Sequence, residues 1–322
     1  YTFIAFFFQV ISKNKFIGII LSLIFFIVNV ATEFFGFDHS LYKFGGKTLG
    51  TYSEMNGYGH FLQPFIWTKI YWLLFGILLL IVSALLMMRG TESSLWKRIK
   101  TIKSQTTKPI IHLASSILIL FIMAGSYIFY NTNILNNYWT SSEQVSFRVD
   151  YEKSLKHLEY IPQPKITDVN LEVELYPTDR SYEVKGKYIL KNTTNTPIQE
   201  VHIQKMIASH LTLENVSFKG GAVTDTKYAK FDYTIYKLSK PLQVNSSIEM
   251  TFTQSFTPKG FEEGNSDTKL VYNGTFFNNT VFPTLGYNKK YELSREGERT
   301  ENGLQPRLNK AKIDDENELV NA

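Results

Sequence analysis

Long apolar runs fill the first part of the chain, and short alternating runs fill the rest. The run at 109–130 has no charged side chain and can cross a bilayer, because about 20 helical residues span the ~30 Å hydrocarbon core. Comparable runs lie at 16–37 and 65–88, after an apolar helix tail at 1–11. Buried helices of soluble proteins have similar composition, but three such runs in succession favour spans. The pattern predicts a membrane α-helical region over 1–130, with three full spans plus the tail of a fourth.

The formal net charge of +5 is concentrated between two of these runs. The segment 89–108 contains one acidic residue, Glu92, and the basic residues Arg89, Lys97, Arg98, Lys100, Lys103 and Lys108. The positive-inside rule places such a segment in the cytoplasm, so we expect residues 131–322 on the extracytoplasmic side of a multi-pass membrane protein. The lipid bilayer is then an expected partner, and no nucleic acid is needed to explain the charge.

The chain beyond the membrane region has a different hydrophobic period. A juxtamembrane linker, 131–164, contains a partial helical period at 143–160, which predicts a short helix. The period then changes to two, in runs at 166–176, 182–191, 201–205, 211–218, 231–238 and 248–256. Short alternating strands with turn residues between them predict an all-β antiparallel saddle or sandwich domain over 165–285.

The sequence contains none of the common catalytic or cofactor motifs. It has no cysteine, no H-E-x-x-H zinc motif, no Gly-rich phosphate loop and no G-x-S-x-G elbow. We interpret His202 and His210 as ordinary surface or edge residues. Glu262 and Glu263 lie near glycines, and we interpret them as solvated loop residues. We therefore predict no catalytic, cofactor-binding or metal-binding residue within these 322 positions.

Two stretches, 50–63 and 273–287, have an unusual mixture of glycine, asparagine and aromatic residues. The second reads NGTFFNNTVFPTLGY. Exposed backbone and amide side chains in such a mixture favour a groove for an extended peptide. A structural loop that closes the sheet explains the second stretch equally well, and the sequence does not separate the two interpretations.

Several runs together resemble one protein family. They are TYSEMNGYGHFLQPFIWTKIYW, RGTESSLWKRI, YEKSLKHLEYIPQPKITDVNLEVELYPTDRSYEVKGKYILKN, NGTFFNNTVFPTLGYNKKYELS and GLQPRL. In these runs the chain is similar to large proteins of Bacteroidetes-like bacteria, in which an ABC-transporter permease is fused to an aminopeptidase N-like zinc aminopeptidase. The resemblance implies a permease-like region at 1–130 and the N-terminal β-saddle of the peptidase at 165–285. It also implies that 286–322 begins the connection to a catalytic domain.

In that family the saddle packs on the catalytic domain and helps bind the N-terminal end of a peptide substrate. The zinc site and the Gly-x-Met-Glu-Asn motif of the catalytic domain do not occur in these 322 residues, so we expect both, with the zinc, in a segment that follows. The family's Gln-x-Glu ahead of Phe282-Pro283 is also missing. Asn273, Thr275 and Asn278 occupy that neighbourhood, and the resemblance implies that they contact substrate.

Two functions follow as hypotheses. In the first, the chain is a fragment of a membrane-anchored zinc aminopeptidase and ABC permease fusion in the bacterial inner membrane. Its β domain then helps bind peptide N-termini outside the cytoplasm. In the second, the chain is the permease half of a transporter with an external binding domain, works with an ABC ATPase subunit and hydrolyses nothing. Under either hypothesis we expect these 322 residues alone to be catalytically silent.

Overall fold

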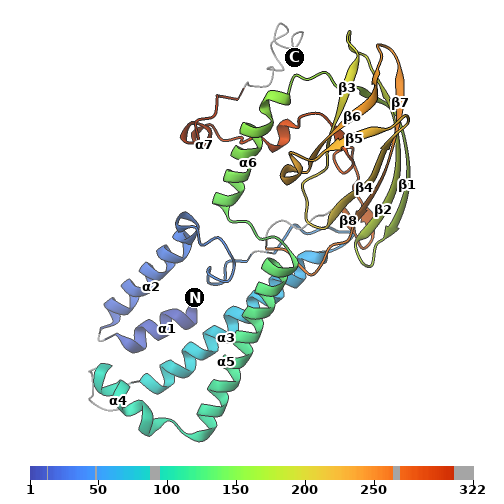
Figure 1. The fold of residues 1–322 in the computed structure, drawn as a ribbon. Helices are drawn as coiled ribbons and strands as arrows, with labels where there is room; N and C mark the ends of the chain where they lie inside the picture. The colour runs from blue at the N-terminus through green and yellow to red at the C-terminus, as the bar shows by residue number, and fades with distance from the viewer. Residues whose placement is uncertain (13, 48, 88–94, 264–268, 308–322) are drawn as a thin grey trace. The chain divides into compact units, whose positions relative to one another are not determined.

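The computed structural model describes residues 1–12, 14–47, 49–87, 95–263 and 269–307 (Figure 1). Parts of three predicted features lie outside these ranges. Residues 89–94 belong to the predicted basic segment, residue 88 ends the predicted span at 65–88, and 308–322 belong to the predicted connection to a further domain.

The chain forms two compact units, which we describe separately. The helical unit comprises 1–140, 175–182 and 257–276. The sheet unit comprises 141–174, 183–256 and the chain from 277 onward.

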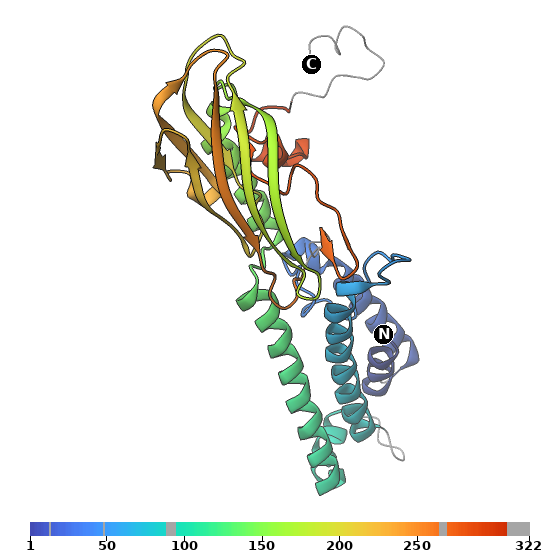
Figure 2. The same cartoon turned by 90° about the vertical axis from the view of Figure 1, so that its right-hand side faces the viewer.

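Four apolar helices and one basic helix make up most of the helical unit. They are α1 (Thr2–Ile11), α2 (Lys15–Ala31), α3 (Leu62–Leu86), the basic α4 (Leu95–Gln105) and α5 (Lys108–Phe129). Short 3-10 helices, η1 (Thr32–Phe35) and η2 (Gly59–Phe61), follow α2 and precede α3, and α5 continues as a π-helix, η3 (Tyr130–Leu135). Helix α1 packs against α2 and α3, and α3 packs against α5, which runs beside it in both views (Figures 1 and 2).

The predicted fold class is wrong in its membrane region. Among the described residues, two helical stretches rather than three are long and apolar enough to cross a membrane, Gly59–Leu86 and Lys108–Leu135. The predicted span at 16–37 instead contains the 17-residue α2, followed by η1. At 1.5 Å per residue α2 covers about 26 Å, less than the ~30 Å hydrocarbon core. Near its end, the buried Asn29 side chain exchanges two hydrogen bonds with the backbone of Phe44, which fixes the following loop against the helix.

One arginine caps the C-terminal ends of two helices of this unit. The buried Arg98 of α4 donates from Nη1 to the Val10 carbonyl at 2.6 Å and to the Leu86 carbonyl at 3.0 Å. Its Nη2 donates to the Ile11 carbonyl at 3.3 Å. The last carbonyls of a helix have no intrahelical donor and carry partial negative charge, so a guanidinium there stabilises the ends of both α1 and α3.

The sheet unit contains two four-stranded sheets. The first sheet has the order β1-β2-β7-β4, with bounds β1 (Lys165–Tyr176), β2 (Ser181–Lys191), β7 (Ser247–Phe256) and β4 (Leu211–Phe218). The second has the order β10-β3-β6-β5, with bounds β10 (Thr284–Leu285), β3 (Ile198–Gln204), β6 (Tyr233–Leu242) and β5 (Ala222–Asp225). Pairs β4–β7, β3–β6, β5–β6 and β10–β3 are antiparallel. A separate pair in the helical unit joins β8 (Leu270–Val271) to β9 (Gly274–Thr275).

The second sheet lies between the first sheet and a helix (Figure 1). On one face, the Tyr236 ring is 5.3 Å from the Phe218 ring of the first sheet. On the other face, Tyr233 and Ile235 form a core cluster with Tyr151 of α6. The helix α6 (Ser141–Leu155) continues as η4 (Lys156–Leu158) and fills this face with Leu155 and Leu158. The predicted fold class is wrong here too, because α6, in the region of the predicted short helix at 143–160, belongs to the same compact unit as the sheets and buries the outer face of the second sheet.

A buried ion pair fixes the chain after the sheets onto α6. Arg299, on α7 (Glu296–Glu301), donates two hydrogen bonds from its guanidinium to the Glu152 carboxylate, at 2.6 and 2.8 Å. Both side chains are buried, and Arg299 also donates to the carbonyls of Leu293 and Gln305. A bidentate pair whose remaining donors are satisfied is the geometry in which a buried charge is tolerated.

Replacing Glu152 by Gln leaves the Arg299 guanidinium buried without its counter-charge. Breaking one side of a buried pair costs ~3–5 kcal/mol. We therefore expect the amides of α6 and α7 to exchange with deuterium about a hundredfold faster or more, measured on the full chain by mass spectrometry. The matched control is Arg295→Gln, which removes an exposed pair with Glu298 and should change exchange by less than about fivefold. Unchanged protection in Glu152→Gln would contradict this role of the pair.

Candidate functional site

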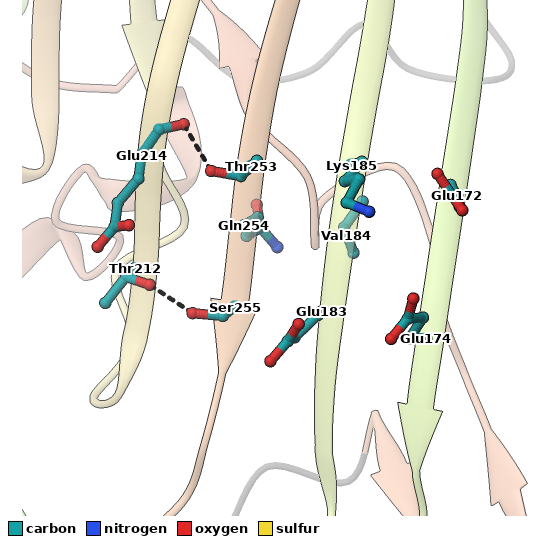
Figure 3. A pocket seen from close by; sticks show the side chains of 10 residues that line it. All are labelled: Glu172, Glu174, Glu183, Val184, Lys185, Thr212, Glu214, Thr253, Gln254 and Ser255. Carbon is teal, nitrogen blue, oxygen red and sulfur yellow. Dashed lines mark hydrogen bonds between the residues drawn. The ribbon is translucent and has the colours of Figure 1, made fainter.

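An open groove of about 250 Å³ lies on the outer face of the first sheet. Figure 3 shows its lining side chains on four adjacent strands, β1, β2, β7 and β4. They are Glu172, Glu174, Glu183, Val184, Lys185, Thr212, Glu214, Thr253, Gln254 and Ser255. Two hydrogen bonds join β4 and β7 in the groove. The hydroxyl groups of Thr212 and Ser255 are 2.6 Å apart, and the Thr253 hydroxyl donates to the Glu214 carbonyl at 3.2 Å.

The alternation of side chains along the strands explains why this face is polar. On β2, Tyr182, Val184, Tyr188 and Leu190 are buried, so the residues between them point to the groove side. Gly186 lies on the buried side, where a Cβ atom would come within 2.1 Å of the Phe252 ring. The glycine thus lets a large ring fill the inner layer, while the charged residues remain outside.

Carboxylates dominate the charge of the groove. Its lining contains four glutamates and one lysine, a formal charge of −3, and all four glutamates are exposed. Such a surface attracts cations such as an ammonium group. No group of three or more metal-ligating side chains with the geometry to hold a metal ion occurs among the residues that the structure describes. The arrangement fits reversible binding of a cation.

The structure separates the three residues for which the resemblance implies substrate contact. Asn273, in the helical unit, is exposed and donates from Nδ2 to the carbonyl of Met55. Thr275 is exposed on β9. Asn278, in the sheet unit, is exposed and accepts hydrogen bonds from the backbone and hydroxyl of Thr280. None of the three side chains lines the groove on the first sheet.

The two unusual stretches meet through that Asn273–Met55 hydrogen bond within the helical unit. Farther along the second stretch, Thr284 and Leu285 form β10, which pairs with β3. The buried Val281 accepts a hydrogen bond from Gln254 through its carbonyl. Residues 281–285 therefore close the sheet, which was the structural interpretation of this stretch.

Of two polar residues that we had interpreted as solvent-facing, one is half-buried and the other is fully buried. Glu263 is 12% exposed, and its carboxylate accepts hydrogen bonds from the backbone N–H and hydroxyl of Ser40, at 2.7 and 2.9 Å. His202 is fully buried, with Nδ1 2.8 Å from the Tyr233 hydroxyl and Nε2 3.7 Å from the Glu200 carboxylate. Both predictions were wrong. The alternating pattern around His202 does not reveal that this side chain is buried. Helix α6 covers the face of the sheet on which His202 lies, and the pattern does not predict the position of α6.

Comparisons with known proteins give little support to any family. No protein family matches the sequence. No curated protein matches it either. A mutant two-domain M1 zinc metallopeptidase bound to L-tryptophan matches 32% of this chain with 10% identity and a TM-score of 0.25. A mutant M1 zinc metallopeptidase from Deinococcus radiodurans, bound to a Tyr-Ser-Ala substrate, matches 35% with 13% identity and a TM-score of 0.24. The chain spans 22% and 23% of the lengths of these two structures, and likeness of this extent does not establish a shared fold.

The buried His202 predicts a pH dependence of the second sheet. Burial lowers the pKa of its imidazole from the ordinary 6.5, although the nearby Glu200 carboxylate opposes the change. The unfolded chain then binds the proton more readily than the folded chain. Stability is therefore fully present above pH 6.5 and falls as the pH drops toward the folded-state pKa, by up to ~1.4 kcal/mol per pH unit.

Hydrogen exchange of β3 and β6 measures this effect. We expect protection factors in the full chain to fall on acidification below pH 6.5 by up to about tenfold per unit. The His202→Gln variant should lose most of this dependence, whereas His210→Gln, in the turn before β4, should retain it. An identical pH dependence in wild type and His202→Gln would assign the titration to another group.

Proposed function

We propose that this chain is part of a membrane-anchored zinc aminopeptidase, and that its sheet unit binds the cationic N-terminal end of peptides outside the cytoplasm. The observation that carries the proposal is the open groove on the first sheet, with its hydroxyl groups and excess of carboxylates. The sequence runs that resemble the β-saddle supply the expectation that a peptide is the ligand.

The groove offers complementary chemistry for a peptide N-terminus. A free amino terminus is an ammonium at neutral pH when its pKa is near the usual 7.7–8.0. Exposed carboxylates attract it, and the hydroxyl groups of Thr212 and Ser255 and the amine of Lys185 supply polar partners for the following peptide bond. Hydrolysis is assigned to the zinc site of a further domain, since the groove contains no metal-ligand cluster among its described residues.

Two features support a membrane location. Among the described residues, the apolar windows of Gly59–Leu86 and Lys108–Leu135 are only 17% and 11% buried, unlike the core helix of a soluble protein. Between them, α4 carries Lys97, Arg98 and Lys100 and no acidic residue. By the positive-inside rule, α4 then lies on the cytoplasmic side of the inner membrane. The chain after residue 135 lies on the extracytoplasmic side.

The proposed binding is tested with trialanine and its N-acetylated form, titrated into the full chain in zwitterionic detergent and followed by calorimetry. We expect trialanine to bind at least several-fold more tightly than the acetylated peptide, because acetylation removes the ammonium charge. The double variant Glu174→Gln and Glu183→Gln should weaken trialanine binding about threefold to tenfold, since each exposed ion pair contributes ~0.2–1 kcal/mol.

A matched control is Asp225→Asn, which removes one exposed carboxylate from the edge of the other sheet. It should leave trialanine binding unchanged. Equal affinities for the free and acetylated peptides would exclude the groove as an amino-terminus site. Zinc-dependent peptide hydrolysis by this chain alone would place a catalytic site within it and overturn the assignment of hydrolysis to another domain.

A further inference from the structure

The first strand of the first sheet has an unusually open edge. Among the described residues, β1 has a strand partner on one side only, β2, and it is 12 residues long. The other sheet edges are shorter or irregular: β5 has four residues, β10 has two, and β4 has eight with a register shift between Glu214 and Ser217. Short strands, bulges and prolines are usual means by which proteins block an edge. Strand β1 is long and contains no proline.

The two faces of β1 differ in chemistry. On the groove side, the strand presents Asp168, Glu172 and Glu174, all exposed. The opposite side is apolar, and Val169 is 53% exposed, with Leu171 and Val173 half-buried. The strand has one basic residue, Lys165, at its first position. A basic side chain within an edge is a common barrier to further pairing, and none lies within this one.

We propose that the outer edge of β1, residues 165–174, is a docking site for an extended peptide whose side chains alternate between basic and apolar. The peptide adds to the first sheet as a fifth strand, and its backbone forms hydrogen bonds with the outward N–H and C=O groups of β1. Its basic residues lie beside the carboxylates on the groove side, and its apolar residues cover the side of Val169.

The charge pattern favours such a peptide over a second copy of this chain. Two β1 strands that pair antiparallel with equivalent faces on the same side, centred on Asn170 or Leu171, place Asp168 directly opposite Glu172 or Glu174. Like charges directly opposite each other destabilise a strand pair. A partner with lysine or arginine at alternate positions replaces this repulsion by attraction.

This docking needs no free amino terminus, which separates it from the proposed function, although Glu172 and Glu174 belong to both sites. The probe is a fluorescein-labelled ten-residue peptide of alternating lysine and valine with acetylated and amidated ends, titrated by anisotropy into the full chain in zwitterionic detergent. We expect saturable binding, with slower deuterium exchange in the amides of 165–174. The same peptide with N-methyl groups on alternate residues, and one with glutamate in place of lysine, should each bind at least tenfold more weakly.

Charge reversal at Asp168 provides the test within the chain, because this carboxylate lies outside the lining of the groove. Asp168→Lys should weaken binding of the lysine–valine peptide about threefold to tenfold or more, and the milder Asp168→Asn should change it in the same direction. Asp225→Lys, the same change at the short edge β5, should have no effect. Equal binding of the N-methylated peptide, absence of saturable binding, or protection outside β1 would each overturn the proposal.

Discussion

The second sheet is buried on both faces, and much of the sheet unit follows from this constraint. One face packs on the first sheet through Phe218 and Tyr236, and the other packs on α6. The polar groups that alternation places on the α6 side then require internal partners. His202 meets the Tyr233 hydroxyl, and the Gln204 side chain donates to the Phe231 carbonyl and accepts from the hydroxyl of Tyr151. A buried polar group without such a partner costs about 1–3 kcal/mol, so position and hydrogen bonding are specified together.

The same constraint extends to the chain that follows the sheets. Glu152 of α6 is buried, and a buried carboxylate is tolerated only when it is paired and hydrogen-bonded. Arg299 supplies the counter-charge and is itself held by the Leu293 carbonyl. Nearby, the Glu292 carboxylate is 2.7 Å from the Lys156 amine, at the start of η4. The buried layer thus combines an apolar centre with a small number of fully paired charges, as expected where charges lie inside a protein.

The hydrophobic pattern predicts part of this arrangement. Each of the alternating runs overlaps a strand, because a half-buried strand needs a period of two. The partial helical period at 143–160 predicts a short helix in the region of α6, but it does not predict that this helix covers the second sheet. The pattern also does not predict the length of α2, whose apolar run continues beyond the last helical turn. The order of strands in a sheet is also not encoded in the period. For this reason Glu174 and Thr212, which are far apart in sequence, could not be assigned to one groove beforehand. The resemblance directed attention to Asn273, Thr275 and Asn278, which lie elsewhere.

The hydrogen bonds from Arg98 to the ends of α1 and α3 constrain the order in which the helical unit is assembled during synthesis. The carbonyls of Val10 and Ile11 leave the ribosome almost ninety residues before their donor, and that of Leu86 leaves only twelve residues before it. Until α4 is made, the ends of α1 and α3 are bonded to water or to other groups. The guanidinium is therefore the last part of this junction to arrive, and it joins a helix made early to one made late. The ends of three helices become a single junction only after Arg98 has been translated.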